Sequence, residues 1–509
     1  MIDKGDRMRR ASLFILAIFF GVLVFGGRAS AQTNEAMERG LLAAKEKEWV
    51  LAIKYFKEAQ EKAPLEPKIL FNLALASDKT GDRLLFSLAY YRVYLVLAPD
   101  AENAKQVATR IRELEVKLEA EAQNFIRKAK EALKQVEVKD SGVCYAGIAR
   151  AMIGVGDIPG ALSFALTNPL DVYTKGYDFG LIAAAQAQAG NFEDAKDTAR
   201  KLASAATDDL ARSSALDRIL GVVSDGQANK NDFSAAKKTT ESISGIATRN
   251  YCYEHIAESQ AEAGDFAAAE QTVTFIKDDD DCLSQTYSFI AKAKAEAGDL
   301  AGAKKYIQLA KESVVKAAAS VYLEASSHDG PRLKIAIAEL AAGEIDAAKK
   351  TFDTLTKEEY TIRSYTLDFN RALALALAKS GKVSEAKKVV SGMSDFYFKA
   401  KTYKMIVELQ IKNKDIPGAQ STVDIIEPKD IKYAAQGLVE QAAGRTKQAK
   451  AYAIYALMND PAFKEMEDFP DFIQSFKAKE PKWVCWSLAN TATNLALFSR
   501  QLREIGEKK

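Results

Sequence analysis

The chain has 509 residues, of which 48% are apolar, so it is long enough for about three domain-sized units with a substantial core. About one residue in six is Ala, whereas only 28 Gly and 11 Pro are present, which favours long helices over collagen-like, disordered or all-β structure. The 71 basic and 69 acidic side chains nearly cancel, so the overall charge indicates no nucleic-acid partner. Two His in the whole chain disfavour His-based catalysis and a multi-His metal site.

Residues 1–31 have the pattern of a secretory signal peptide. Basic residues precede an apolar stretch from Ala11 to Gly27, and Ala29-Ser30-Ala31 supplies small residues for cleavage before Gln32. We therefore expect export to the periplasm or cell envelope, or secretion, with no integral membrane association once the segment is removed. A retained anchor is the open alternative, because about 17 apolar residues almost span a bilayer.

A pattern with a period near 34 residues recurs from residue 33 to about residue 460. Most copies have a small residue, a turn residue seven positions later and Ala five positions after the turn, as in Ala257, Gly264 and Ala269. A turn-forming residue between two segments of helical periodicity predicts an antiparallel helix pair, and such pairs must stack to bury their apolar faces. The sequence therefore predicts an all-α fold, an α-solenoid. Its eleven turn positions are Lys47, Gly81, Gly156, Gly190, Asn231, Gly264, Gly298, Gly343, Gly381, Lys414 and Gly444.

This repeat resembles the tetratricopeptide repeat (TPR) family, as found in exported bacterial proteins. The first copy matches the family spacing best, and the second has one residue inserted after its turn. The matching residues of the first copy are Gly40, Trp49, Ala52, Phe56, Ala59 and Pro64, and those of the second are Ala74, Gly81, Tyr91 and Pro99. Later copies keep the small residue, Gly and Ala but lack the closing Pro, so they are TPR-like.

Five segments follow from these patterns. They are a signal peptide (1–31), an N-terminal TPR module (32–100), a connecting or capping helix (101–140), a TPR-like solenoid (141–460) and C-terminal capping helices (461–509). The last segment is expected to cover the end of the final repeat. Because it carries Trp483 and Trp486, an aromatic partner-binding patch is the alternative.

The resemblance implies a concave groove lined by the first helix of each pair, suited to a protein or peptide partner. Carried onto this sequence, the family register puts the groove-facing side chains near 13, 10 and 6 positions before each turn. These partner-groove residues are Arg150, Tyr177, Tyr251, Glu254, Glu258, Lys292, Arg371, Lys404 and Glu408. The solvated helix surface is the alternative interpretation for each of them.

No residue pattern predicts a catalytic centre, a cofactor or a bound metal. The acidic run Asp278–Asp281 lacks the spacing of a calcium loop and is better explained as a helix cap. His255 and His328 have no partner at ligand spacing, which predicts ordinary packed or surface histidines. Cys252 and Cys282 fall near the same end of neighbouring helices and are a candidate disulfide, with two inert buried thiols as the alternative.

The sequence therefore predicts a non-catalytic protein–protein interaction scaffold that docks a partner segment in the solenoid groove. One alternative is an α-helical enzyme acting on polysaccharides, because rings of helical hairpins can carry paired carboxylates. Dispersed acidic residues and an expected open superhelix argue against that enzyme. Another alternative is a membrane-tethered assembly factor, which differs from the scaffold in the fate of residues 1–31. The sequence leaves the oligomeric state open.

Overall fold

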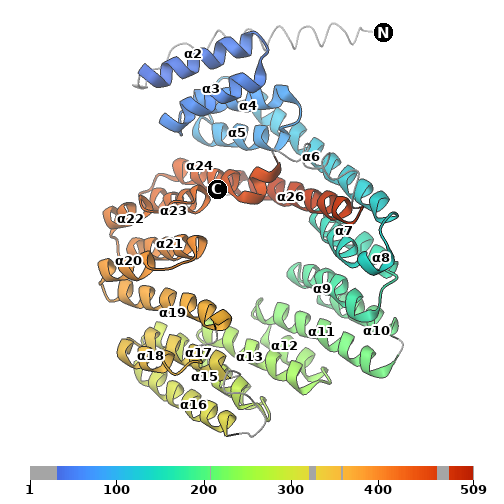
Figure 1. The fold of residues 1–509 in the computed structure, drawn as a ribbon, viewed down its shortest axis with the longest axis vertical. Helices are drawn as coiled ribbons and strands as arrows, with labels where there is room; N and C mark the ends of the chain where they lie inside the picture. The colour runs from blue at the N-terminus through green and yellow to red at the C-terminus, as the bar shows by residue number, and fades with distance from the viewer. Residues whose placement is uncertain (1–30, 207, 320–327, 357–358, 467–480, 508–509) are drawn as a thin grey trace. The chain divides into compact units, whose positions relative to one another are not determined.

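The computed structural model describes residues 31–206, 208–319, 328–356, 359–466 and 481–507; the predicted signal peptide, save its last residue, lies outside them. Within these residues the regular structure is helical throughout, with no strand, and consecutive helices form antiparallel pairs (Figure 1). The predicted all-α solenoid of stacked helix pairs is therefore confirmed. None of the helices in the described ranges has the length and apolar composition needed to cross a bilayer.

The chain divides into two compact units, each built from segments that are distant in sequence. Unit 1 takes the residues up to Leu118 together with Gly444–Met458 and Phe498–Lys509. Its main helices are α2 (Ala31–Lys45), α3 (Trp49–Lys62), α4 (Pro67–Thr80), α5 (Leu84–Leu97), the first half of α6 (Ala104–Leu133) and most of α24 (Thr446–Asn459). The division thus falls inside the predicted connecting helix.

Unit 2 comprises Glu119–Ala443 and Asn459–Leu497. The first helices of its pairs, called A helices below, are α7 (Gly142–Gly154), α9 (Val172–Gln188), α11 (Asp209–Ala228), α13 (Ile246–Glu262), α15 (Asp280–Glu296), α17 (Asp329–Ala341), α19 (Glu359–Lys379), α21 (Phe396–Lys412) and α23 (Lys429–Ala442). The second helices, called B helices, are α8 (Ile158–Leu166), α10 (Phe192–Ser204), α12 (Phe233–Glu241), α14 (Phe266–Val273), α16 (Leu300–Ala318), α18 (Ile345–Phe352), α20 (Val383–Ser391) and α22 (Ile416–Val423). A short 3-10 helix η1 (Val138–Asp140) precedes α7, and α26 (Pro481–Glu507) ends the described chain.

The turn of every predicted repeat has a left-handed backbone. All eight Gly turn positions and the three non-Gly ones, Lys47, Asn231 and Lys414, have φ between 60° and 88°. Gly adopts this conformation without the Cβ clash that other residues suffer, which explains why it dominates these positions. The small residues around each turn are buried where the two helices meet, as shown by Ala257 and Ala269, each 0% exposed.

Two further side-chain patterns fix the helices of a pair to one another. In several turns the next residue is Asp, which caps the B helix; Asp265, for example, accepts from the backbone N–H of Ala268 at 3.1 Å. In four pairs a Gln four positions before the turn accepts a hydrogen bond from a Thr eight positions after it. These buried bonds join Thr198 to Gln186 (2.8 Å), Thr239 to Gln227 (2.8 Å), Thr272 to Gln260 (2.6 Å) and Thr422 to Gln410 (2.6 Å).

A third pattern ties three A helices to the loop that follows their own B helix. An Asp or Asn fourteen positions before the turn bonds to a backbone N–H 27 residues further on. Asp217 accepts from Ser244 (2.9 Å), Asn250 from Lys277 (3.1 Å) and Asp329 from Thr356 (3.0 Å). Because these acceptors are buried, the bonds satisfy backbone groups of the loop that would otherwise be desolvated.

Successive A helices pack on one another from α7 to α23, while each B helix packs mainly on A helices. The A helices thus form a continuous layer of unit 2. The predicted groove residues lie on helices of this layer.

The first part of helix α26 makes a contact that the sequence did not predict. Its buried residues Cys485, Leu488, Ala489 and Ala492 join the apolar cluster of α6 and α7, at the start of unit 2. Figure 1 shows α26 beside α7. The predicted cap on the final repeat did not include this contact, because chain order says nothing about helices more than 300 residues apart. In unit 1, likewise, the hydroxyl of Tyr455 donates to the carbonyl of Pro64.

The packing of Gly40 generates a prediction for unit 1. A Cβ at Gly40 would overlap the ring of Phe56, which is fully buried, so Gly40→Ala should lower the free energy of unfolding by about 1–3 kcal/mol. Gly180→Ala in α9 is the matched control, because its Cβ meets open space, and it should raise stability by about 0.5–1 kcal/mol. Urea denaturation followed by circular dichroism measures both. Equal stability of the Gly40→Ala variant and the parent chain would contradict the close contact.

Candidate partner-binding site

Most predicted groove residues have accessible side chains on the A-helix layer, several of them paired with one another. The guanidinium of Arg150 on α7 donates to the hydroxyl of Tyr177 on α9 at 2.7 Å, so two neighbouring A helices share one polar surface. Lys404 and Glu408 form an ion pair along α21 at 2.5 Å. The guanidinium of Arg371 lies 4.7 Å from the ring centroid of Phe398, bridging α19 and α21.

Three predicted groove residues gather with two others on α11 and α13. We call Asp225, Tyr251, Glu254, His255 and Glu258 the acidic cluster. The ring of Tyr251 is 52% exposed and meets the imidazole of His255 edge-on, with 4.3 Å between ring centroids. Glu254 is more enclosed than expected, at 9% exposed, and accepts a hydrogen bond from the thiol of Cys282 at 3.3 Å.

The carboxyl groups of this cluster are partly desolvated. Burial raises the pKa of Asp225, Glu254 and Glu258, and the nearby imidazole of His255 acts in the opposite direction in each case. The Oδ1 atom of Asp225 is buried without a hydrogen-bond partner among the described residues. A buried acceptor without a donor is costly, so a donor from a bound molecule would be stabilised here.

Positive charge approaches the cluster from the following A helices. Lys334 of α17 and Lys292 of α15, another predicted groove residue, both act to lower the pKa of Glu258. The surface near the cluster thus carries charges of both signs. In chemical terms it offers carboxylate acceptors and an aromatic face. Within the described residues, no group of three or more His, Cys, Asp or Glu is arranged to hold a metal ion.

Sequence analysis missed Asp225 and His255 as members of one cluster. Asp225 lies six positions before the turn residue Asn231, so the groove register already contained it, but the non-Gly turn made that copy less conspicuous. His255 lies on the same helix as Tyr251 and Glu258, and no spacing rule marked it. That His255 lies near residues of α11 follows only from the packing of α11 against α13.

The candidate disulfide between Cys252 and Cys282 is absent from the structure, in which both residues are buried free thiols, in line with the alternative interpretation. The two side chains face different partners: Cys252 lies against Ser224 and Thr240, and Cys282 donates to Glu254. Burial raises the pKa of both thiols, that of Cys252 to about 12. Spacing along the chain could not show this, because it does not give the direction in which each side chain points from its helix.

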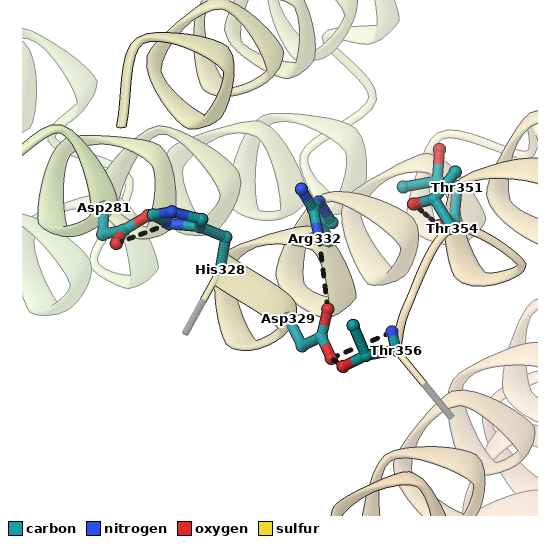
Figure 2. Close-up of polar contacts among 7 residues, drawn as sticks. All are labelled: Asp281, His328, Asp329, Arg332, Thr351, Thr354 and Thr356. Atoms are coloured by element: carbon teal, nitrogen blue, oxygen red, sulfur yellow. Dashed lines mark hydrogen bonds and ion pairs between the residues drawn. The ribbon is translucent and has the colours of Figure 1, made fainter. Parts of the chain in front are cut away.

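His328 and the acidic run both have structural roles, and Figure 2 shows the contact of His328 with Asp281. His328 is 1% exposed, and its Nδ1 lies 2.9 Å from both carboxylate oxygens of Asp281, which ties the start of α17 to α15. Asp279 caps α15 by accepting from the N–H of Cys282 at 2.9 Å. The interpretations of His328 as a packed histidine and of the acidic run as a cap are therefore confirmed.

A buried carboxyl group lies beneath the groove surface of α9. Asp178 is 1% exposed and accepts a hydrogen bond from the side-chain amide of Asn168 at 3.0 Å. Burial raises the pKa of Asp178 to about 6, and the bond from Asn168 only partly offsets this effect.

Asp178 therefore destabilises the fold at neutral pH. Since its pKa of about 6 exceeds the usual value near 3.8, the cost is fully present above pH 6 and fades as the pH falls toward 4. Asp178→Asn keeps an acceptor for Asn168 and should raise the free energy of unfolding at neutral pH by about 1–3 kcal/mol. Urea denaturation across this pH range should show the gain vanish in acid. A gain independent of pH would contradict the assignment.

Comparisons with known proteins add little to this geometry. No family model matches the chain, and no curated protein matches it. Among solved structures, it resembles a chain of Naa15/Naa10 bound to HypK, with 14% identity and a TM-score of 0.30 over 90% of this chain and 94% of the other. It also resembles a chain of the APC/C hetero-tetramer Cut9–Hcn1, with 12% identity and a TM-score of 0.27 over 92% and 88%. At these TM-scores the likeness carries no argument about function. By its own helix pairs the chain is a TPR-like helical-repeat solenoid.

Proposed function

We propose that this protein is a non-catalytic interaction scaffold whose A-helix layer docks a segment of a partner protein. The acidic cluster on α11 and α13 is the observation that carries the proposal. It combines partly desolvated carboxyl groups, an unpartnered acceptor on Asp225 and the exposed ring of Tyr251. A basic side chain complements all three features at once.

The partner segment that fits this surface carries Arg or Lys. A guanidinium or ammonium donates charge-assisted hydrogen bonds to carboxylates, and each such bond is worth about 1.5–3 kcal/mol. Its aliphatic stem or cationic head packs on an aromatic ring such as Tyr251. The positive groups on α15 and α17 favour an acidic residue further along the same segment, which would set the direction of docking.

Affinity capture tests this proposal. The mature chain, residues 32–509, is used as bait in an envelope extract, and the enriched proteins are identified by mass spectrometry. Glu258→Lys and Tyr251→Ala should each reduce recovery of the partner by about tenfold or more, the loss expected when one strong contact is removed.

Glu193→Lys is the matched control, because Glu193 lies on the B helix α10 with a side chain 78% exposed. Glu254 is unsuited to charge reversal because it is nearly buried. Recovery that is unchanged by Glu258→Lys and Tyr251→Ala would contradict docking at the cluster. If nothing is enriched, the scaffold itself loses support, and glycan binding and hydrolysis become the next assays.

The signal-peptide pattern of residues 1–31 supports export of this scaffold to the periplasm or cell envelope. We expect the mature protein to begin at Gln32 when it is expressed in a bacterial host. Intact-mass measurement of the protein from the envelope fraction checks this start. A chain that retains Leu13–Phe25 would instead indicate the membrane-tethered assembly factor.

A further inference from the structure

Helix α26 approaches α7 closely because both helices place small residues at the contact. A Cβ added to Gly147 would lie 3.3 Å from the Cβ of Ala489, and one added to Gly154 would lie 3.5 Å from the Cβ of Ala496. These Cβ–Cβ separations are as short as, or shorter than, the Cβ–Cβ distance of about 3.5–4.5 Å found in disulfides. The two helices run in the same direction, since contacts advance together along both.

Cys144 and Cys485 lie one turn before the contact of Gly147 with Ala489. Both side chains are 0% exposed and belong to the same apolar cluster of unit 2. Each thiol donates to a backbone carbonyl: Cys144 to Lys482, three residues before Cys485, at 3.5 Å, and Cys485 to Ala129 on α6 at 3.3 Å. The two side chains are thus close neighbours in the cluster, and each shifts the pKa of the other.

The two thiols differ in acidity. The neighbouring thiol of Cys485 and the positive charge of Lys482 lower the pKa of Cys144, whereas the neighbouring Cys144 and burial raise the pKa of Cys485. The charge of Lys482 thus favours the thiolate at Cys144. Cys252 and Cys282 have no thiol neighbour in the structure, and each packs against oxygen-bearing side chains instead.

We propose that Cys144 and Cys485 form a redox-active pair whose disulfide staples α26 to the first helix pair of unit 2. The oxidant is a disulfide of low molecular mass or one carried by an oxidoreductase. The Cys144 thiolate attacks one sulfur of that disulfide and releases one thiol, giving a mixed disulfide. Cys485 then loses its proton and attacks the Cys144 sulfur, so the second thiol leaves. In sum, the two protein thiols lose two hydrogens and the oxidant becomes two thiols.

The staple has a consequence for the array. Without it, α26 is held on α7 by packing of small and apolar side chains, and its detachment would expose Ile148 and the other core residues of the first pair. With it, detachment requires a reductant. Whether α26 stays packed on the first helices of unit 2 thus depends on the redox state of the compartment.

Oxidation of the full chain tests this inference independently of any partner. The protein is refolded from denaturant in oxidised glutathione, free thiols are alkylated in the unfolded state, and peptides are mapped by mass spectrometry. We expect a peptide linking Cys144 to Cys485 in most molecules, with Cys252 and Cys282 alkylated. The oxidised chain should also unfold at a higher temperature than the reduced chain.

Two sets of variants keep the test decisive. The double variant Cys252→Ser with Cys282→Ser should retain the linked peptide and the thermal shift. Cys485→Ala and Cys485→Ser, which differ in how they fill the packed site, should both lose the link and the shift. Alkylation of all four thiols after refolding in oxidised glutathione would overturn the proposal. A link between Cys252 and Cys282 in place of the expected one would overturn it equally.

Discussion

The left-handed residue at each turn is the constraint on which the rest of the structure depends. It reverses the chain within a few residues, so that an A helix and its B helix start from a fixed separation and their small residues meet. Because Ala257 and Ala269 are fully buried at one such meeting point, a larger side chain at either position would force the pair apart. Repetition of this geometry gives unit 2 its regular layer of A helices. Where Asn231 or Lys414 replaces Gly, the same backbone persists at a conformational cost.

Buried hydrogen bonds fix the register between neighbouring helices more narrowly than apolar packing alone. The Gln–Thr bonds fix the A helix against its own B helix in four pairs, and the bonds of Asp217, Asn250 and Asp329 fix the loop that leads toward the next pair. All these groups are buried, so a pair that shifted by one position would leave several of them unsatisfied. The acidic cluster depends on that precision, because Asp225 and His255 belong to different pairs and come together only when α11 and α13 are in register.

The local parts of this account could be read from the sequence, and the non-local parts could not. Gly264 and its flanking Ala residues predict the turn, the helix pair and the repeat. All three depend on residues within about one repeat length of each other. The groove register likewise located Tyr251 and Glu258. In contrast, the contact of α26 with α7 and the meeting of Cys144 with Cys485 join residues 341 positions apart, as their numbering shows. Spacing also left the candidate pairing of Cys252 with Cys282 open, since it gives the height of a residue along a helix but not the direction of its side chain.

The central claim is that the A-helix layer is the working surface of this protein. Hydrogen exchange measured by mass spectrometry, on the mature chain alone and in complex with a captured partner, tests it most directly. The account predicts slower exchange on binding in peptides from α11 and α13, with the B helices α12 and α14 unchanged. Protection confined to the B helices, with α11 and α13 exchanging as in the free chain, would contradict it.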